Sequence, residues 1–309
     1  MKTEQGKKII GLACGRKNGN SEILLKEALM CAEQHEPAVK TEIIRAMDLD
    51  IRPCRGCQAC GSPGKPPKKC IIKDDVEWIL NKTMLEDAAL IISFPCYHLQ
   101  VNGHLKMITD RMNPVMVRNM DIMNKTRIGA LICVGGSGSN WTSMAFAAAN
   151  IYLQHTRILV DQMQVNYAPL AGDVLAMDSA LARARGLGRN VAKSIILPIS
   201  DVKYLGPQND MECPVCHCRL FHVPDRLPDV YCPVCWVHGT LIADGSIMKV
   251  KWNEEDARFP RFSLEAHYKH FKEQVETVDR FIEENKDKYS KKSELLQKYI
   301  HYGNVVKPQ

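Results

Sequence analysis

The 309-residue sequence has no long apolar run. Nothing in it approaches the roughly 20 consecutive apolar residues that a membrane-spanning helix needs. The short apolar run near the N-terminus is too brief for the core of a signal peptide, because Arg16 and Lys17 soon follow it. We therefore expect a cytoplasmic protein with no membrane partner.

An excess of charge of one sign is also missing. The sequence has 41 basic and 35 acidic residues, a formal net charge of +6. The basic residues are scattered and mostly matched by acids, apart from a small patch at Lys65, Lys68 and Lys69. This pattern does not favour a nucleic-acid partner. The GxGxxG signature is absent too, so a Rossmann dinucleotide site is not expected.

Cysteine, in contrast, is plentiful. The chain has 13 cysteines, and nine of them fall into two compact groups, four at 54–70 and five at 213–235. In a reducing cytoplasm, cysteines grouped at CxxC spacing indicate metal or redox centres more than structural disulfides.

The first two hundred residues alternate apolar, β-prone runs with helical patterns. A helix is predicted over 21–36, and further helices near Asp75, Gly103, Thr142 and Met177. The predicted strands are Lys8 to Ala13, Val39 to Ala46, Ala89 to Phe94, Arg127 to Val134 and Ile158 to Val165. Such alternation predicts an α/β domain over 1–205 with a flavodoxin-like, doubly wound, five-stranded parallel sheet. Ligands of this fold bind beyond the carboxyl ends of the strands.

A smaller domain is predicted over 211–251, where Cys, Pro and His are frequent. Its spacing C-x2-C-x15-C-x2-C builds a closed four-thiolate metal site of the zinc-ribbon or rubredoxin form, with the ligands Cys213, Cys216, Cys232 and Cys235. Structural zinc and redox-active iron both fit this spacing. Cys218 is out of register, although it could exchange with Cys216.

The C-terminal extension, 260–309, is predicted to be helical. Ser263 is a candidate cap for a long helix. The apolar residues repeat at four-three spacing: Leu264, Tyr268, Phe271, Val275, Val278 and Ile282. This stripe suits either a subunit interface or packing on the helix's own domain.

The turn after the first strand reads ACGRKNGNSE. A small, polar turn that opens a helix offers backbone N–H groups and the positive helix end to a phosphate. Side-chain donors are expected from Arg16, Asn18, Asn20 and Ser21. The alternative is an ordinary polar turn in which Ser21 caps the helix.

This turn resembles the Gly-Ser-Pro-Arg-Lys-Asn-Gly-Asn-Thr loop of the NAD(P)H-dependent FMN reductase and iron-sulfur flavoprotein families. Cys14 and Gly15 stand where those proteins have serine and proline. FPCYHLQVNGHLKMITDRM and VGGSGSN resemble two further loops of these families, and the similarity spans about 7–195. It implies non-covalent FMN, with its phosphate in the first loop. The residues implied near the flavin ring are Pro95, Cys96, Tyr97, His98, Gly135, Gly136 and Ser137.

The stretch CRGCQACGSPGKPPKKC, 54–70, has the spacing C-x2-C-x2-C-x9-C. Three thiols at three-residue steps can wrap one face of an iron-sulfur cluster, and a fourth closes it. The iron-sulfur flavoproteins have a similar run, followed by an acidic pair like Asp74 and Asp75. We expect a 4Fe-4S cluster on Cys54, Cys57, Cys60 and Cys70. Free thiols, a redox disulfide or a zinc site remain alternatives.

Together these features predict an FMN-dependent oxidoreductase of the iron-sulfur flavoprotein type. It would pass electrons between a reduced donor, NAD(P)H or ferredoxin, FMN and the cluster. His98 or Tyr97 could donate a proton near the ring, but no catalytic residue is assigned. The resemblance also implies a homo-oligomer, a dimer or tetramer. The alternatives are a cluster-free NAD(P)H-dependent FMN or quinone reductase and a non-catalytic electron-transfer flavoprotein.

Overall fold

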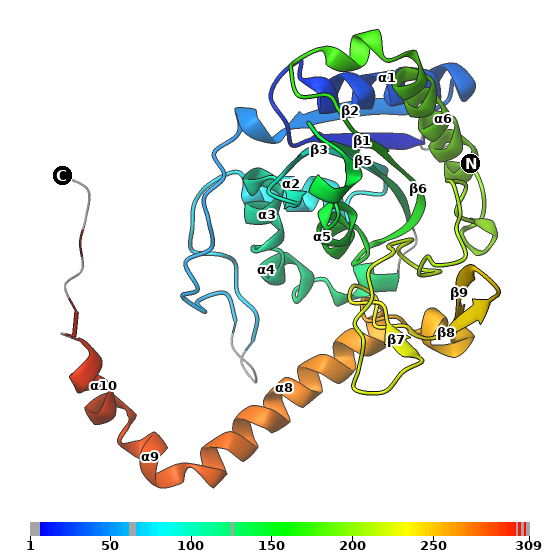
Figure 1. Cartoon of the computed structure of the whole chain (residues 1–309). Helices are drawn as coiled ribbons and strands as arrows, with labels where there is room; N and C mark the ends of the chain where they lie inside the picture. The colour runs from blue at the N-terminus through cyan, green and yellow to red at the C-terminus, as the bar shows by residue number, and fades with distance from the viewer. Residues whose placement is uncertain (1–6, 62–65, 125–126, 301, 304–305, 307–309) are drawn as a thin grey trace, which may run out of the picture.

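The computed structural model describes residues 7–61, 66–124, 127–300, 302–303 and 306 (Figure 1). Parts of the predictions lie outside the described residues. They include the chain ends at 1–6 and 307–309, which belong to predicted domains, and residues 62–65 of the cysteine loop, which include Lys65.

The core of the protein is a parallel sheet of five strands. Their order is β2-β1-β3-β5-β6, which is the flavodoxin order once the parallel strands alone are counted. The bounds are β1 Lys8–Ala13, β2 Lys40–Arg45, β3 Ala89–Tyr97, β5 Arg127–Val134 and β6 Arg157–Val165. The predicted fold class is therefore confirmed, and each strand lies within three residues of its predicted bounds.

The largest departure from the predicted strands is at the end of β3, which continues three residues past Phe94. A short strand, β4 (Gln100–Val101), pairs antiparallel with this extension. His98 and Leu99 make the tight turn between them, both with positive φ, 48° and 74°. The loop that was expected to border the flavin ring is thus a small hairpin at the carboxyl end of β3.

Helices cover both faces of the sheet, as its near-continuous apolar strands require (Figure 1). One face packs against α1 (Asn20–His35) and α6 (Asp178–Ile195). The other packs against α2 (Val76–Leu80), α3 (Gly103–Thr109), α4 (Asn113–Met116) and α5 (Ala145–Leu153). Short 3₁₀ turns lie at Ala46–Asp48, Met120–Asn124, Ser139–Trp141, Asp173–Ala176 and Ile199–Asp201, and a π turn at Asn81–Leu85.

A small module follows the sheet domain. Its antiparallel strands are β7 (Asp229–Tyr231), β8 (His238–Asp244) and β9 (Ile247–Trp252), followed by α7 (Glu254–Arg258). The buried cysteines of 213–235 form its core together with Val234, Val237 and Phe262. This core packs against Phe146 and Ala147 of α5, so the module is seated on one helical layer of the sheet domain.

The chain ends in three helices, α8 (Leu264–Glu284), α9 (Lys286–Ser290) and α10 (Lys292–Ile300). The predicted cap of α8 is confirmed, because Ser263 Oγ accepts a hydrogen bond from Ala266 N at 3.2 Å. Beyond its first turns, α8 projects away from the body of the protein (Figure 1). None of the helices in the described part of the chain combines the length and apolar character needed to cross a bilayer.

Candidate functional site

A cavity of about 300 Å³ lies at the carboxyl ends of the strands. It is lined by the loops that follow β1, β3, β5 and β6: Gly15, Arg16, Gly19, Asn20, Ser21, Pro95, Cys96, Tyr97, Val134, Gly136, Ala168 and Pro169. A second hollow of about 310 Å³ shares part of this wall and is lined by Cys96, Tyr97, His98, Gly135, Gly136, Ser137 and Trp141. The fold therefore gathers all of the predicted flavin-site residues except Asn18 around two adjoining hollows.

At Gly15 the wall of the first hollow has no room for a side chain. A Cβ added at Gly15 would lie 2.3 Å from Ser21 Oγ and 3.2 Å from Pro95 Cδ. Helix α1 begins here, and no side chain of the described residues caps its first turn. The free N–H groups and positive end of a 16-residue helix thus face a narrow polar cavity, which fits a phosphate group.

Two asparagines of the first loop do not offer their side chains as expected. Asn20 Nδ2 donates to the carbonyl oxygens of Ala168 at 3.0 Å and Leu170 at 2.7 Å, and its Oδ1 accepts from Gly172 N at 2.8 Å. Both amide hydrogens are thereby used to fasten the loop after β6, so only the backbone of Asn20 is left for a ligand.

Asn18, with a positive φ of 55°, is exposed, and its Oδ1 accepts from Lys26 Nζ at 3.3 Å. Its backbone N–H donates to Glu22 Oε2 at 3.0 Å. The Glu22 carboxylate is fully buried and also accepts from Arg45 Nε at 2.9 Å. These contacts shape the turn from outside the cavity, a part that the motif did not reveal.

Two large aromatic side chains, Tyr97 and Trp141, line the hollows, and Tyr167 is hydrogen-bonded through its N–H to Ser137 of their wall. Tyr97, Trp141 and Tyr167 expose 59%, 62% and 73% of their surface. Planar rings of this size, left open beside a backbone-lined hollow, suit stacking against a flat ligand. Trp141 and Tyr167 were not singled out in the sequence: Trp141 lies one residue beyond the VGGSGSN motif, and Tyr167 follows the last strand of the parallel sheet, where no motif was recognised.

The thiols near the cavity differ in their surroundings. Cys96 Sγ donates to Trp141 O at 3.5 Å, and a hydrogen bond with Cys133 lowers the pKa of Cys96. Cys14 is buried in the core instead, and burial raises the pKa of its thiol far above the usual range. Its carbonyl oxygen accepts from Asn102 Nδ2 at 2.7 Å. Cys96 therefore lines both hollows, whereas Cys14 is part of the hydrophobic core.

The cysteines of the small module form a closed group. The Sγ atoms of Cys213, Cys216, Cys232 and Cys235 all lie within 4.8 Å of one another, and all four residues are buried. Tetrahedral zinc with Zn–S bonds of about 2.3 Å places its sulfurs about 3.8 Å apart, so the set fits a single metal ion. Cys218 is buried beside the group but is not a member of it.

Helix α5 supports this group from the sheet domain. Asn150 Nδ2 donates to Cys216 O at 3.3 Å, and Gln154 Nε2 donates to Val215 O at 3.3 Å. The first CxxC turn is thereby hydrogen-bonded to a helix that also borders the core of the sheet domain. Asn150 of α5 and Gln154, the residue just after this helix, thus help to hold the module in place.

The loop cysteines are arranged differently. Cys54 and Cys57 are exposed, and Cys60 and Cys70 are half-buried. Within the described residues their sulfurs do not meet in one compact group as the distal four do. Burial raises the pKa of Cys60, and the charges of the other three thiols raise it further, so the four lie within electrostatic range of one another.

The composition of this loop fits an anionic centre. From 52 to 73 the sequence has six basic residues and no acidic one. Gly56, with φ of 62°, makes a turn between the first two thiols, and its N–H points to Cys54 Sγ at 3.5 Å. The donor set is thus four thiols on a turn-rich, positively charged loop, which is compatible with an iron-sulfur cluster.

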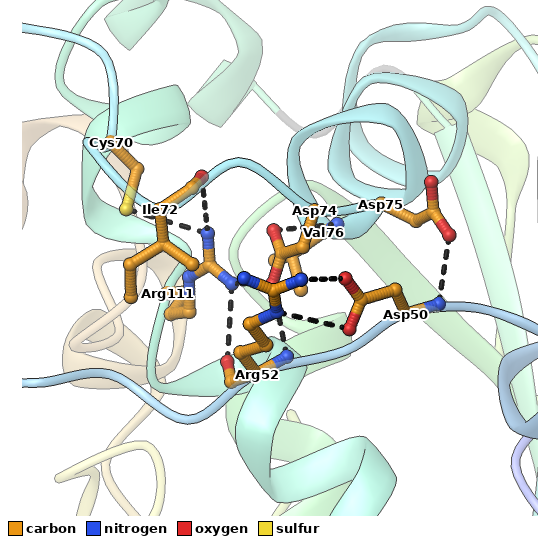
Figure 2. Close-up of polar contacts among 8 residues, drawn as sticks. All are labelled: Asp50, Arg52, Cys70, Ile72, Asp74, Asp75, Val76 and Arg111. Atoms are coloured by element: carbon orange, nitrogen blue, oxygen red, sulfur yellow. Dashed lines mark hydrogen bonds and ion pairs between the residues drawn. The ribbon is translucent and has the colours of Figure 1, made fainter.

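Buried charges lie beneath the loop (Figure 2). Arg111, just after α3, pairs with Asp74, and its Nη2 donates to Cys70 Sγ at 3.4 Å. Burial by itself raises the pKa of Asp74, but hydrogen bonds from Arg111 and from Arg52 N lower it below its ordinary value. Arg111 lies in one of the motifs, although its spacing from the cysteines gave no signal of this contact.

Comparison with known proteins decides the family. A profile described as NADPH-dependent FMN reductase matches residues 7–169, the part that carries the sheet and the loops around the cavity. The chain belongs to this family. It is therefore a flavin-dependent oxidoreductase of flavodoxin-like fold, as the sequence predicted.

Relatives of this FMN reductase family member include iron-sulfur flavoproteins. One from Methanocaldococcus jannaschii is 33% identical over 201 residues, 62% of this chain and 98% of the relative. A flavone synthase from Aspergillus candidus is 25% identical over 255 residues, 76% of this chain and 78% of that protein. A solved flavone reductase structure superposes with a TM-score of 0.75 at 24% identity, covering 97% of this chain and 100% of that one. The fold similarity thus extends over the module and the C-terminal helices.

Proposed function

We propose that this FMN reductase family member binds FMN in the cavity at the carboxyl ends of its strands. One observation carries the proposal: segments at the ends of four strands meet in this cavity, around the uncapped start of α1. The N–H groups of the first turn, with Arg16 and Ser21, would hold the phosphate. Tyr97, Gly136 and Trp141 would border the ring. Bound FMN supplies the transfer of electrons in pairs or singly.

The proposed electron path links this flavin to the loop at 54–70. The four loop thiols would hold a 4Fe-4S cluster, and the distal quartet one zinc or rubredoxin-type iron. The reduced donor would be NAD(P)H or ferredoxin. Three observations support this assignment: the four-thiol spacing, the basic loop, and the similarity to iron-sulfur flavoproteins. We assign these roles to separate parts of the chain. FMN and the cluster loop belong to 1–205, the distal metal belongs to 211–251, and 260–309 is the helical extension.

Gly15→Ala tests the flavin site. The added methyl group would overlap Ser21 Oγ and close the phosphate cradle, so we expect FMN affinity to fall about tenfold or more. Gly103→Ala is the matched control, because a Cβ at Gly103 meets no atom within 4 Å. Fluorescence titration of the flavin-free variants with FMN measures both. Wild-type affinity in a folded Gly15→Ala protein would place the phosphate elsewhere.

The cluster and donor need a separate experiment. Anaerobically prepared protein should hold about four irons and four acid-labile sulfides per chain besides the distal metal, and NADPH, NADH and reduced ferredoxin are then compared as reductants under anaerobic stopped flow. FMN without labile sulfide, even after reconstitution, would favour the second candidate, a cluster-free NAD(P)H-dependent FMN or quinone reductase. The observation that favours this second candidate is that the loop thiols are exposed or half-buried rather than gathered in the core.

A homo-oligomer, dimer or tetramer, is also proposed. On the projecting α8, Tyr268, Val278 and Phe281 expose 58%, 38% and 56% of their surface. An apolar stripe of this kind is covered most simply by a second copy. Light scattering of dilute FMN-loaded protein is the test, and a monomer of 34.8 kDa would contradict the proposal.

A further inference from the structure

One buried side chain touches both ends of the cysteine loop. Arg111 exposes only 2% of its side chain, and its two terminal nitrogens reach in different directions. Nη1 pairs with Asp74 and donates to Arg52 O at 3.1 Å, two residues before Cys54. Nη2 donates to Cys70 Sγ and to Ile72 O, each at 3.4 Å. Figure 2 shows the guanidinium lying between these two segments of the chain.

Asp74 completes the connection from the other side. Its carboxylate is fully buried and accepts from Arg52 N at 2.9 Å and from Val76 N at 3.3 Å. Next to it, Asp75 Oδ2 accepts from Asp50 N at 2.8 Å, and Asp75 N donates to Asp50 O at 2.9 Å (Figure 2). The residues before Cys54 and those after Cys70 are thereby held side by side.

Only arginine suits this position. Its planar guanidinium presents several N–H groups in a rigid fork, whereas the ammonium of lysine is a compact point charge on a flexible stem. The fork reaches a carboxylate, two carbonyl oxygens and a sulfur at once. Of the four loop thiols, Cys70 has this fixed cationic donor among the described residues, while Cys54 and Cys57 lie exposed.

We propose that Arg111 is a positioning residue for the metal centre of the loop. It holds the sulfur of Cys70 in place, keeps the segment leading to Cys54 beside it, and sets a fixed positive charge against one ligand of the cluster. This inference rests on the proposed function, in which the loop holds a cluster. Partners of this kind around metal ligands tune both affinity and reduction potential.

The test compares Arg111→Gln and Arg111→Lys with the wild type after identical anaerobic reconstitution. In Arg111→Gln we expect the affinity for the cluster, followed as labile sulfide per FMN, to fall about tenfold or more. The cluster that remains should have a more negative midpoint potential, because the positive charge is gone. Arg111→Lys keeps the charge without the fork, so its occupancy should fall while the potential stays near that of the wild type.

Two further proteins control for folding. Arg183→Gln breaks the ion pair of Arg183 with Asp161, whose side chain is fully buried like that of Asp74. This ion pair does not involve the cysteine loop, so the variant should keep wild-type sulfide. The double variant Arg111→Met with Asp74→Leu removes both charges, so no unpaired charge stays buried. It should fold, bind FMN and still lose sulfide. Wild-type sulfide and potential in the double variant and in Arg111→Gln would overturn the inference.

Failure of the proposed cluster is recognised separately, because the wild type itself would then hold no sulfide. In that case amide hydrogen exchange of the metal-free proteins decides whether Arg111 positions the thiols. Exchange of the Arg52 amide, which donates to Asp74 beside Arg111, should be at least about tenfold faster in Arg111→Gln than in the wild type and in Arg183→Gln, since the base of the loop is released. Equal exchange in the three proteins would overturn the inference.

Discussion

This protein has two groups of four cysteines, the loop group at 54–70 and the distal group of two CxxC pairs at 213–235, and their surroundings are opposite. The distal sulfurs lie within 4.8 Å of one another in the core of the small module. The loop sulfurs are exposed or half-buried, and Cys70 is held at the base of the loop, where its sulfur meets Arg111. Four thiols become a preformed site only where packing brings them together. The fold alone gathers the distal sulfurs, whereas it does not bring the loop sulfurs into one compact group.

Charge separates the two groups as well. The loop has six basic residues between 52 and 73 and no acidic one, whereas 210–229 around the distal knuckles has four acidic and two basic residues. A cluster with four thiolates is anionic, and nearby positive charges stabilise it. The distal site depends on burial and hydrogen bonds from α5 instead. The same residue type thus stands in a basic, exposed loop in one place and in a buried, more acidic module in the other.

The largest effect is expected for Cys232→Ser. It removes one ligand of a closed site, and structural zinc contributes roughly 10 kcal/mol to the folding of small modules, so the module should lose its metal and unfold. Metal analysis and thermal unfolding followed by circular dichroism measure the two losses. A variant with full metal and an unchanged melting temperature would show that the distal quartet does not hold a structural ion.

Cys57→Ala should behave in the opposite way. Its side chain is exposed, so the free energy of unfolding should change by no more than about 0.5 kcal/mol, as for most surface substitutions. Labile sulfide should disappear nevertheless, while FMN and the distal metal stay. Absorption spectra and sulfide assays on the same preparation make this comparison. Marked destabilisation of the metal-free variant would mean that the loop thiols pack structurally, as the distal ones do.

The smallest effect is expected for Cys218→Ser, which tests the edge of the distal site. Cys218 lies beside the ligands, with Asn150 Nδ2 at 3.7 Å from its sulfur, but outside their group. Serine keeps a hydrogen-bonding group there, so we expect full metal content and a loss of at most about 1 kcal/mol of stability. Loss of the metal would show that Cys218 exchanges with Cys216 as a ligand.

Much of the architecture is encoded locally, and there the sequence was sufficient. Continuous apolar runs place β1 and β5 at the predicted bounds, because a strand that is buried on both faces needs apolar residues along its whole length. Ser263 caps α8 for the same local reason. The two cysteine groups were recognisable from their spacing, and the three flavin loops from their resemblance to known families. The family match covers the segment that carries most of them.

The roles of individual side chains were decided by contacts between distant segments. Asn20 was expected to donate to a phosphate, but its amide fastens the loop near Leu170, 150 residues away. Arg111 meets Asp74 across 37 residues and Cys70 across 41, because α3 packs beside the loop. By itself the sequence determined the fold, the cofactor class and the two thiol sets. Only the tertiary structure decided which thiols are already gathered, because sequence spacing limits how far apart two side chains can lie, while packing determines where they meet.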